Sequence, residues 1–349
     1  MLTERHRCLR SQGTPAKQEE RPLGLQDIDT VAEKVLAKNI RAAARAMRWV
    51  DDRDPRANDL LRKLYPHTGN ALILGVTGNP GSGKSTLVNA LIGQYRANGK
   101  TVGVCAVDPS SPFSGGAILG DRIRMQDHFN DDGVFIRSLA TRGHLGGLSG
   151  STLDTVTIMD AMGLDVIIVE TVGVGQDEVE VVRMADTTVV VVVPGLGDEI
   201  QALKAGILEI ADVFCINKAD RDGVDRLEAD IQSMQEFDHA AGRSFRPVIR
   251  TVAIRGEGIG ELCEAIQAHA SGSDADGRRL TGQTTMRLRT VLDDRLLGGV
   301  LKALRSEGTF EDAVARILDR KSDPYTEAER LIARGIELLA QAGDPPEAN

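Results

Sequence analysis

Eight residues in the first quarter of the chain could bind phosphate groups. The segment Gly78-Asn79-Pro80-Gly81-Ser82-Gly83-Lys84-Ser85 has the pattern G-x-x-x-x-G-K-[ST], which is typical of a P-loop. Backbone N–H groups of such a loop, together with the N-terminal end of the following helix, face a di- or triphosphate. Lys84 would reach the outer phosphates, the Ser85 hydroxyl would bind Mg²⁺, and Thr86 would complete the phosphate site.

Two carboxylates follow the second apolar run of the chain. Asp108 comes directly after the run 101–107 and opens a loop rich in glycine and serine, and Asp121 lies further along. Near a phosphate site, these two carboxylates suit Mg²⁺ coordination or the orientation of an attacking water. The alternative is that each aspartate only caps a turn or a helix.

Glu170 ends a further apolar run and is followed by Thr171-Val172-Gly173. An acidic residue at a strand end, followed by glycine, indicates the second half of a P-loop site. The carboxylate would hold Mg²⁺, directly or through water, and the glycine amide would sense the γ-phosphate. Lys84, Asp108 and Glu170 are therefore the candidate catalytic residues.

A late strand candidate ends at Asn217-Lys218-Ala219-Asp220, an N-K-x-D motif. The Asp220 carboxylate can accept hydrogen bonds from N1–H and the 2-amino group of guanine. Adenine lacks that amino group and would leave the charge unpaired, at a cost on the order of 2–3 kcal/mol. The motif therefore predicts a guanine nucleotide. At the end of the last strand candidate, backbone amides of Val252, Ala253 and Ile254 could meet guanine O6.

These residues are positioned by an alternation of short apolar runs and helical patterns. Near-continuous Val and Ile composition in the runs predicts strands covered on both faces, hence a mostly parallel, doubly wound α/β sheet. In such sheets ligands bind at the carboxyl ends of the strands. The predicted strands are 71–77, 101–107, 134–139, 166–169, 188–193, 213–216 and 248–252, and a helix is predicted over 86–95.

Helical segments flank this core. We expect a disordered tail over 1–22, a helical extension over 23–66, a P-loop domain over 67–270 and a C-terminal arm over 271–349. In the extension, one helical apolar face continues from Ile28 to Val50, and Asp27 is the candidate N-cap. After a break, the helical pattern begins again over residues 57–64. The arm shows two apolar helical patterns, 288–304 and 328–336, that have little core of their own. An oligomerisation arm is therefore expected.

Composition narrows the classes of partner. A net charge of −9 argues against a general nucleic-acid or anionic-membrane partner, and the sequence shows neither a signal peptide nor an apolar run long enough to cross a bilayer. Cys105 and Cys215 lie inside apolar strand runs and are expected to be buried, inert thiols. We therefore expect a cytoplasmic protein in a reducing compartment.

Taken together, these segments resemble the MeaB (ArgK/MMAA) family of P-loop GTPases, which belongs to the SIMIBI class. The matching residues span the core: 79–81, 108–122, 140–148, 170–176, 197–199 and 217–220. The glutamate at position 170, where aspartate is usual, and the long loop after Asp108 are features of that family. Some members are also named as transport kinases, but nothing here resembles a kinase loop for a protein substrate.

The resemblance implies a homodimeric GTPase that protects and loads a coenzyme B12-dependent acyl-CoA mutase, typically methylmalonyl-CoA mutase, with an adenosyltransferase as a possible further partner. It also assigns roles within the site. Lys84 and Ser85 would bind phosphate and Mg²⁺, and Asn217, Lys218 and Asp220 would read guanine. The resemblance places Asp108, Asp121 and Glu170 in the metal shell, and Asp198, Gln201 and Lys204 in a switch that couples nucleotide state to the partner. From the residues alone, 194–204 is only a loop leading into a surface helix.

Two other functions stay open. A metallochaperone GTPase for nickel insertion would need Cys and His ligands, and the six histidines are scattered without pairing to cysteine. A nucleotide-gated scaffold with little hydrolysis would have the same motifs as an active GTPase, so motifs do not distinguish the two. Nothing in the residues chooses among methylmalonyl-CoA, isobutyryl-CoA and ethylmalonyl-CoA mutases as the partner.

Overall fold

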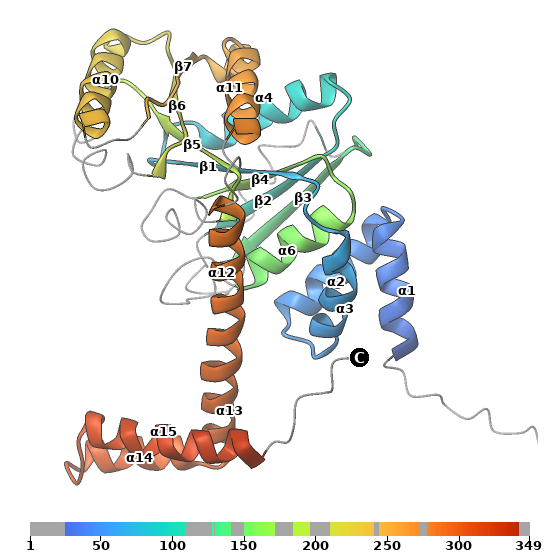
Figure 1. Cartoon of the computed structure of the whole chain (residues 1–349), viewed down its shortest axis with the longest axis vertical. Coiled ribbons are helices and arrows are strands. Elements are labelled where there is room, and N and C mark those ends of the chain that lie inside the picture. Colours follow the sequence, from blue (N-terminus) through green and yellow to red (C-terminus); the bar gives the residue numbers. More distant parts are fainter. Residues whose placement is uncertain are drawn as a thin grey trace, which may run out of the picture.

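A parallel sheet forms the centre of the protein (Figure 1). The computed structural model describes residues 25–108, 128, 130–140, 150–171, 184–195, 210–240, 244–272 and 278–341. In this part of the chain the sheet has seven strands in the order β3-β2-β4-β1-β5-β6-β7, and every pairing is parallel. The predicted α/β fold class is confirmed. The strands are β1 (Leu72–Gly78), β2 (Val102–Asp108), β3 (Val134–Ala140), β4 (Val166–Glu170), β5 (Thr187–Val192), β6 (Val213–Asn217) and β7 (Val248–Thr251).

Both faces of the sheet are covered by helices. Helices α4 (Lys84–Ala97) and α11 (Ile259–Gly272) pack on one face, where they share a core with residues such as Ile168. The neighbouring Ile167 and Val169 point to the other face, into a core shared with α6 (Gly150–Ala161). Helix α10 (Val224–Ala240) packs on β5 and β6. Because successive side chains of a strand alternate between faces, the strands are buried on both sides, which explains their continuous Val and Ile runs.

The N-terminal extension consists of α1 (Leu25–Leu36), α2 (Ile40–Asp51) and α3 (Arg56–Leu64), followed by a short 3-10 turn (Tyr65–His67). Its buried side chains belong to the same core as α6 and one face of the sheet. The apolar face predicted to continue from Ile28 to Val50 is divided between two helices. The chain breaks at Lys38, which has a φ of 61°, and the Asn39 side chain caps α2 by accepting from the Ala42 N–H at 3.0 Å.

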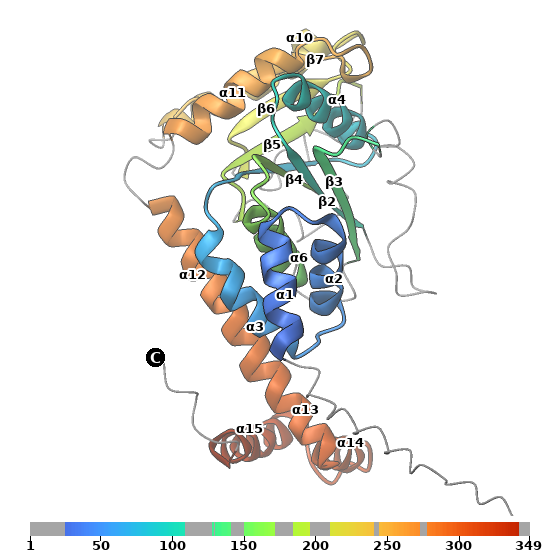
Figure 2. The ribbon, with the colours of Figure 1, turned by 90° about the vertical axis from the view of Figure 1, so that its right-hand side faces the viewer.

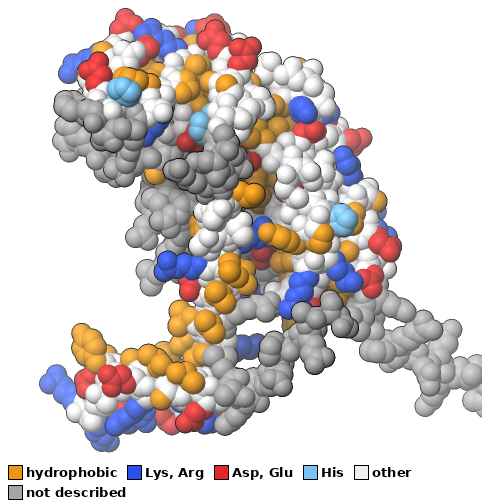
Figure 3. Space-filling view, viewed as in Figure 1, with side chains coloured by type: hydrophobic (Ala, Val, Ile, Leu, Met, Phe, Trp, Pro, Cys, Tyr) orange, Lys and Arg blue, Asp and Glu red, His pale blue; other side chains and the backbone are white. Residues whose placement is uncertain are grey.

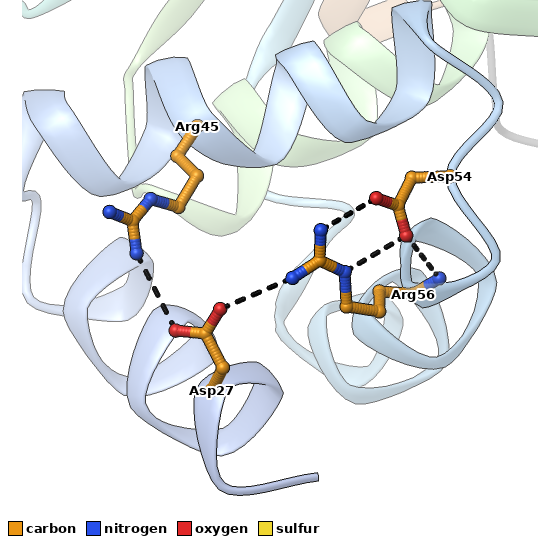
Figure 4. Close-up of polar contacts among 4 residues, drawn as sticks. All are labelled: Asp27, Arg45, Asp54 and Arg56. Carbon is orange, nitrogen blue, oxygen red and sulfur yellow. Dashed lines mark hydrogen bonds and ion pairs between the residues drawn. The ribbon is translucent and has the colours of Figure 1, made fainter. Parts of the chain in front are cut away.

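Asp27 ties these three helices together instead of capping the first one (Figure 4). It lies within the first turn of α1, and its carboxylate accepts hydrogen bonds from Arg45 at 3.5 Å and from Arg56 at 3.4 Å. Arg56 also binds Asp54 through two nitrogens, at 2.9 and 2.6 Å, and stacks on Trp49 at 4.3 Å. The side-chain hydrogen bonds from Arg56 lower the pKa of Asp54 to about 2. The three helices are therefore linked by charged contacts at the surface, while their buried apolar side chains form the core.

The C-terminal arm extends away from the sheet (Figures 1 and 2). It contains α12 (Arg278–Asp293), a π-helical turn (Asp294–Gly298), α13 (Gly299–Ser306), α14 (Thr309–Leu318) and α15 (Pro324–Gln341). The predicted pattern 288–304 is divided between α12 and α13 by the π-helical turn, and the pattern 328–336 lies within α15. Gly308, with a φ of 77°, turns the chain between α13 and α14. Within the described ranges, none of the helices has both the length and the apolar character needed to cross a bilayer.

Helix α12 fastens the arm to the body through two side chains. The Gln283 amide donates to the carbonyl oxygen of Ala185 at 3.0 Å and to that of Met184 at 3.4 Å, just before β5. Arg287 donates to the Thr157 hydroxyl of α6 and lies 5.0 Å from the ring centre of Tyr65. Beyond these contacts the arm packs mainly on itself.

Candidate nucleotide-binding site

The P-loop joins β1 to α4 and depends on two glycines. Gly78 has a φ of 139°, and a Cβ atom there would lie 2.1 Å from the Val191 carbonyl oxygen of β5. Gly83 has a φ of 89°, and a Cβ atom there would lie 2.6 Å from the Asn217 amide nitrogen. Both positions therefore require glycine, for conformation and for space.

Helix α4 begins at Lys84 with no side chain capping its N-terminus. The first N–H groups of a helix lack intrahelical partners and carry partial positive charge, so this end suits a phosphate. The Lys84 side chain is buried and folds back over the loop, where its ammonium donates to the carbonyl oxygens of Gly78 at 2.7 Å and Asn79 at 3.1 Å. The loop thus holds a buried positive charge where a phosphate would bind.

Ser85 and Glu170 meet beside this loop. The Ser85 hydroxyl donates to a Glu170 carboxylate oxygen at 2.6 Å, and both side chains are buried. The neighbouring Thr171 fixes the end of β4 against β1, because its N–H donates to the Val76 carbonyl at 3.1 Å and its hydroxyl to the Thr77 hydroxyl at 2.9 Å. A hydroxyl and a carboxylate oxygen are hard donors of the kind that Mg²⁺ prefers. This pair therefore fits the predicted Mg²⁺ site.

The side chains of the other predicted metal and switch residues lie outside the part of the chain that the structure describes. Asp108 is the last residue of β2, at the same edge of the sheet as the P-loop, but its side chain lies outside the described part. Asp121 and the predicted switch residues Asp198, Gln201 and Lys204 also lie outside the described residues. Among the residues that are described, no three His, Cys, Asp or Glu side chains gather as a metal site.

The N-K-x-D motif is joined directly to the P-loop. Asn217 ends β6, and its amide donates to the Ser82 carbonyl at 2.9 Å. Lys218, with a φ of 57°, extends along the loop and donates to the Gly81 carbonyl at 2.7 Å. The two motifs, more than 130 residues apart in sequence, therefore form one site.

The segment after β7 closes the same site. The side-chain amide oxygen Oδ1 of Asn217 accepts from the Ala253 N–H at 3.2 Å and from the Thr251 hydroxyl at 3.3 Å. The Val252 N–H donates to the Glu257 carbonyl at 3.1 Å. The amides of Val252 and Ala253 are thus engaged inside the protein, and a contact of this segment with guanine O6 stays a prediction.

Asp220 is exposed at the end of the N-K-x-D motif and has a neighbour that the sequence did not indicate. Arg255 donates to its carboxylate at 3.4 Å, and the same guanidinium donates to Glu257 at 2.7 Å. The hydrogen bond to Glu257 raises the pKa of Arg255. In sequence, Arg255 and Glu257 are two residues apart, a spacing that does not bring side chains together in a helix. Only the turn that follows the 3-10 helix Ala253–Arg255 makes the contact.

Cys105 and Cys215 are buried in the strands, as predicted. Burial raises the pKa of each thiol to about 12, so both stay protonated at neutral pH. They are core residues and offer no nucleophile to the site.

Comparison with known proteins agrees with this geometry. The sequence model of the family described as "Methylmalonyl Co-A mutase-associated GTPase MeaB" matches residues 43–304. A protein of Pyrococcus abyssi is 45% identical over 311 residues, which cover 87% of this chain and 96% of the relative. The GTPase ArgK of Escherichia coli is 39% identical over 264 residues, which cover 71% of this chain and 80% of ArgK.

A solved structure is also similar. The crystal structure of an LAO/AO transport system kinase matches with a TM-score of 0.60 and 26% sequence identity, covering 90% of this chain and 99% of that protein. The P-loop, the joined N-K-x-D motif and the family match over most of the sequence lead to one conclusion. The chain belongs to the MeaB family of P-loop GTPases, enzymes that bind guanine nucleotides and hydrolyse GTP.

Proposed function

We propose that the protein uses its GTPase cycle to gate the loading and protection of a coenzyme B12-dependent acyl-CoA mutase, most directly methylmalonyl-CoA mutase. The observation that carries this proposal is the family match, whose description names association with that mutase and whose range, residues 43–304, extends from the helical extension into the arm. An adenosyltransferase that supplies the cofactor is a further candidate for the complex, and the cytoplasm is the proposed location.

Hydrolysis would proceed by in-line attack of water on the γ-phosphate, with the protein supplying position and charge. Lys84 would exchange its two loop carbonyls for phosphate oxygens, and amides of the loop and of α4 would bind the remaining oxygens. Ser85 and Glu170, with Asp108 and Asp121, are proposed to hold Mg²⁺, which when bound neutralises charge on the phosphates. Because this chemistry is mostly positioning, we expect slow turnover alone and faster turnover with the partner.

Guanine selection is assigned to Asp220, with Asn217 and Lys218 fixing its loop to the P-loop. We expect Asp220→Asn to reduce the preference for GDP over ADP by at least about tenfold, because the neutral amide gives up a charged acceptor for N1–H and the 2-amino group. Calorimetric titration of both nucleotides measures the ratio. Asp222→Asn, two residues further along, is the matched control, and an unchanged ratio in Asp220→Asn would reject the base-reading role.

The arm is proposed to form a homodimer. Large apolar side chains are exposed along it, and Figure 3 shows them gathered over α12, α13 and the α14–α15 pair. They include Leu288, Leu292, Leu296, Leu297, Ile332 and Ile336. An apolar surface of this extent on a soluble domain is typical of a contact with another protein.

Light scattering after size exclusion tests the dimer. We expect the wild-type protein to have the mass of two 37.5 kDa chains, and Leu297→Asp with Ile332→Asp to have the mass of one, because each change places a charge in the proposed interface. Phe245→Asp, which changes an exposed aromatic residue outside the arm, should leave the dimer intact. A wild-type mass of one chain would contradict the proposal.

Protection of the mutase is tested by following its activity during turnover. The proposal predicts that mutase activity decays more slowly when this protein and GTP are both present, and that Lys84→Ala removes the benefit. Equal decay of mutase activity with and without the protein would contradict the protective role. It would not contradict the assignment of the protein as a GTPase.

A further inference from the structure

The turn that follows β7 carries a charged pair facing the guanine-reading residue. Its backbone is fixed by the Val252–Glu257 bridge and by Gly258, which has a φ of 75° and where a Cβ atom would lie 2.1 Å from the Arg250 carbonyl oxygen. Gly256, with a φ of 71°, makes the preceding step of the turn. The backbone of the turn therefore requires glycine at both positions, and the Val252–Glu257 bridge joins its two ends.

This turn directs one guanidinium toward two carboxylates. Arg255 binds Glu257 through Nε at 2.7 Å and through Nη2 at 3.3 Å, which is a two-pronged contact that fixes the plane of the guanidinium. The remaining Nη1 nitrogen donates to Oδ2 of Asp220 at 3.4 Å. Glu257 thus orients Arg255, and Arg255 in turn contacts Asp220.

Folding alone gives little reason for this arrangement. The side chains of Arg255 and Glu257 are 48% and 59% exposed, and ion pairs at such exposure contribute little to stability. The effect on Asp220 is different, because a carboxylate rotates over a broad range about its last side-chain bond. Guanine N1–H and its 2-amino group lie in one plane, so both are met only when the carboxylate lies in that plane. A fixed donor on one carboxylate oxygen restricts the rotation, and that oxygen keeps a second acceptor position for the base.

We propose that Arg255, held by Glu257, is a positioning residue that sets the orientation of the Asp220 carboxylate and thereby the selectivity for the guanine 2-amino group. This inference rests on the proposed base-reading role of Asp220. It assigns the pair a part in choosing between guanine and hypoxanthine nucleotides, which differ only in that amino group. The P-loop binds the phosphates independently of this pair. Changes to Arg255 or Glu257 should therefore alter the selectivity for the base.

The test compares the affinities of GDP and IDP by calorimetry for the full-length protein. Wild type should prefer GDP by at least about tenfold, as expected for a hydrogen bond to a charged group. Arg255→Ala should reduce the preference to less than about threefold, mainly by weakening GDP. Arg255→Lys keeps the positive charge but lacks the planar guanidinium, and Glu257→Gln weakens the contact that orients Arg255. Both variants should therefore give a GDP-to-IDP preference between those of wild type and Arg255→Ala. Arg250→Ala removes a similarly exposed arginine that pairs with Asp225 and Glu228, and it should leave the ratio unchanged.

The outcomes separate the possible explanations. An unchanged ratio in Arg255→Ala, with Asp220→Asn reducing it, would overturn the positioning role and leave base reading intact. Equal weakening of GDP and IDP would also overturn it, because that result indicates a direct contact of Arg255 with the base or ribose. No effect of Asp220→Asn would overturn both the base-reading proposal and this inference. Thermal melting of each variant verifies that it is folded.

Discussion

Lys84→Ala is expected to abolish tight binding of GTP. In the structure the Lys84 ammonium is buried against the carbonyl oxygens of Gly78 and Asn79, so it lies in the loop that would surround the phosphates. Removing it deletes a charged donor in a site shielded from water. We expect the affinity for GTP to fall at least about 100-fold, or about 2.7 kcal/mol, and kcat to fall by about 10²–10³. Calorimetry and phosphate release measure the two quantities.

Lys100→Ala provides the matched control for this prediction. Lys100 is an exposed lysine in the turn between α4 and β2, where its ammonium pairs with Asp165. The same loss of one positive charge should there leave GTP binding and turnover unchanged. Wild-type GTP affinity in Lys84→Ala would contradict the phosphate-loop assignment.

Glu170→Gln is expected to stop hydrolysis while the protein still binds nucleotide. Glutamine keeps the size of the side chain and an oxygen that can accept from the Ser85 hydroxyl, but it lacks the negative charge that strengthens the binding of a divalent cation. We expect kcat to fall at least about 100-fold and the concentration of Mg²⁺ needed for turnover to rise. GDP affinity measured without Mg²⁺ should stay within about threefold of wild type, because loss of the carboxylate leaves the loop amides and Lys84 in place.

Glu228→Gln serves as the control, since Glu228 pairs with Arg250 on the surface away from the P-loop. That change should leave the dependence of turnover on Mg²⁺ as in wild type. Turnover by Glu170→Gln at the wild-type rate and with the same Mg²⁺ dependence would exclude Glu170 from the metal shell.

The core of the protein could be predicted from local patterns because its signals are local. Each strand lies within one or two residues of its predicted range, since a buried parallel strand is a short apolar run ended by glycine or a polar residue. The P-loop and the N-K-x-D motif are also local, and their position at strand ends was enough to predict that they meet. The structure adds the contacts by which they do so, through Asn217 and Lys218.

The remaining features depend on contacts between distant residues or on single backbone angles. The break between α1 and α2 depends on one left-handed residue, Lys38, inside an otherwise continuous apolar pattern. Asp27 has the residue type of a cap but is used to bind Arg45 and Arg56. Arg255 reaches Asp220 only because the turn after β7 folds back, and Gln283 reaches the residues before β5 across 98 positions of sequence. No spacing rule for helices or strands indicates such contacts.

We propose that the GTPase cycle of this protein gates a B12-dependent acyl-CoA mutase, and such a partner is expected to stimulate hydrolysis. The most direct test of this central claim is the rate of GTP hydrolysis by the purified protein, measured alone and with increasing amounts of such a mutase from the same source. We expect the rate to rise and saturate with mutase, and to be lost in Lys84→Ala. A rate that stays at its basal value at saturating mutase, with GTP still bound and hydrolysed, would contradict the claim.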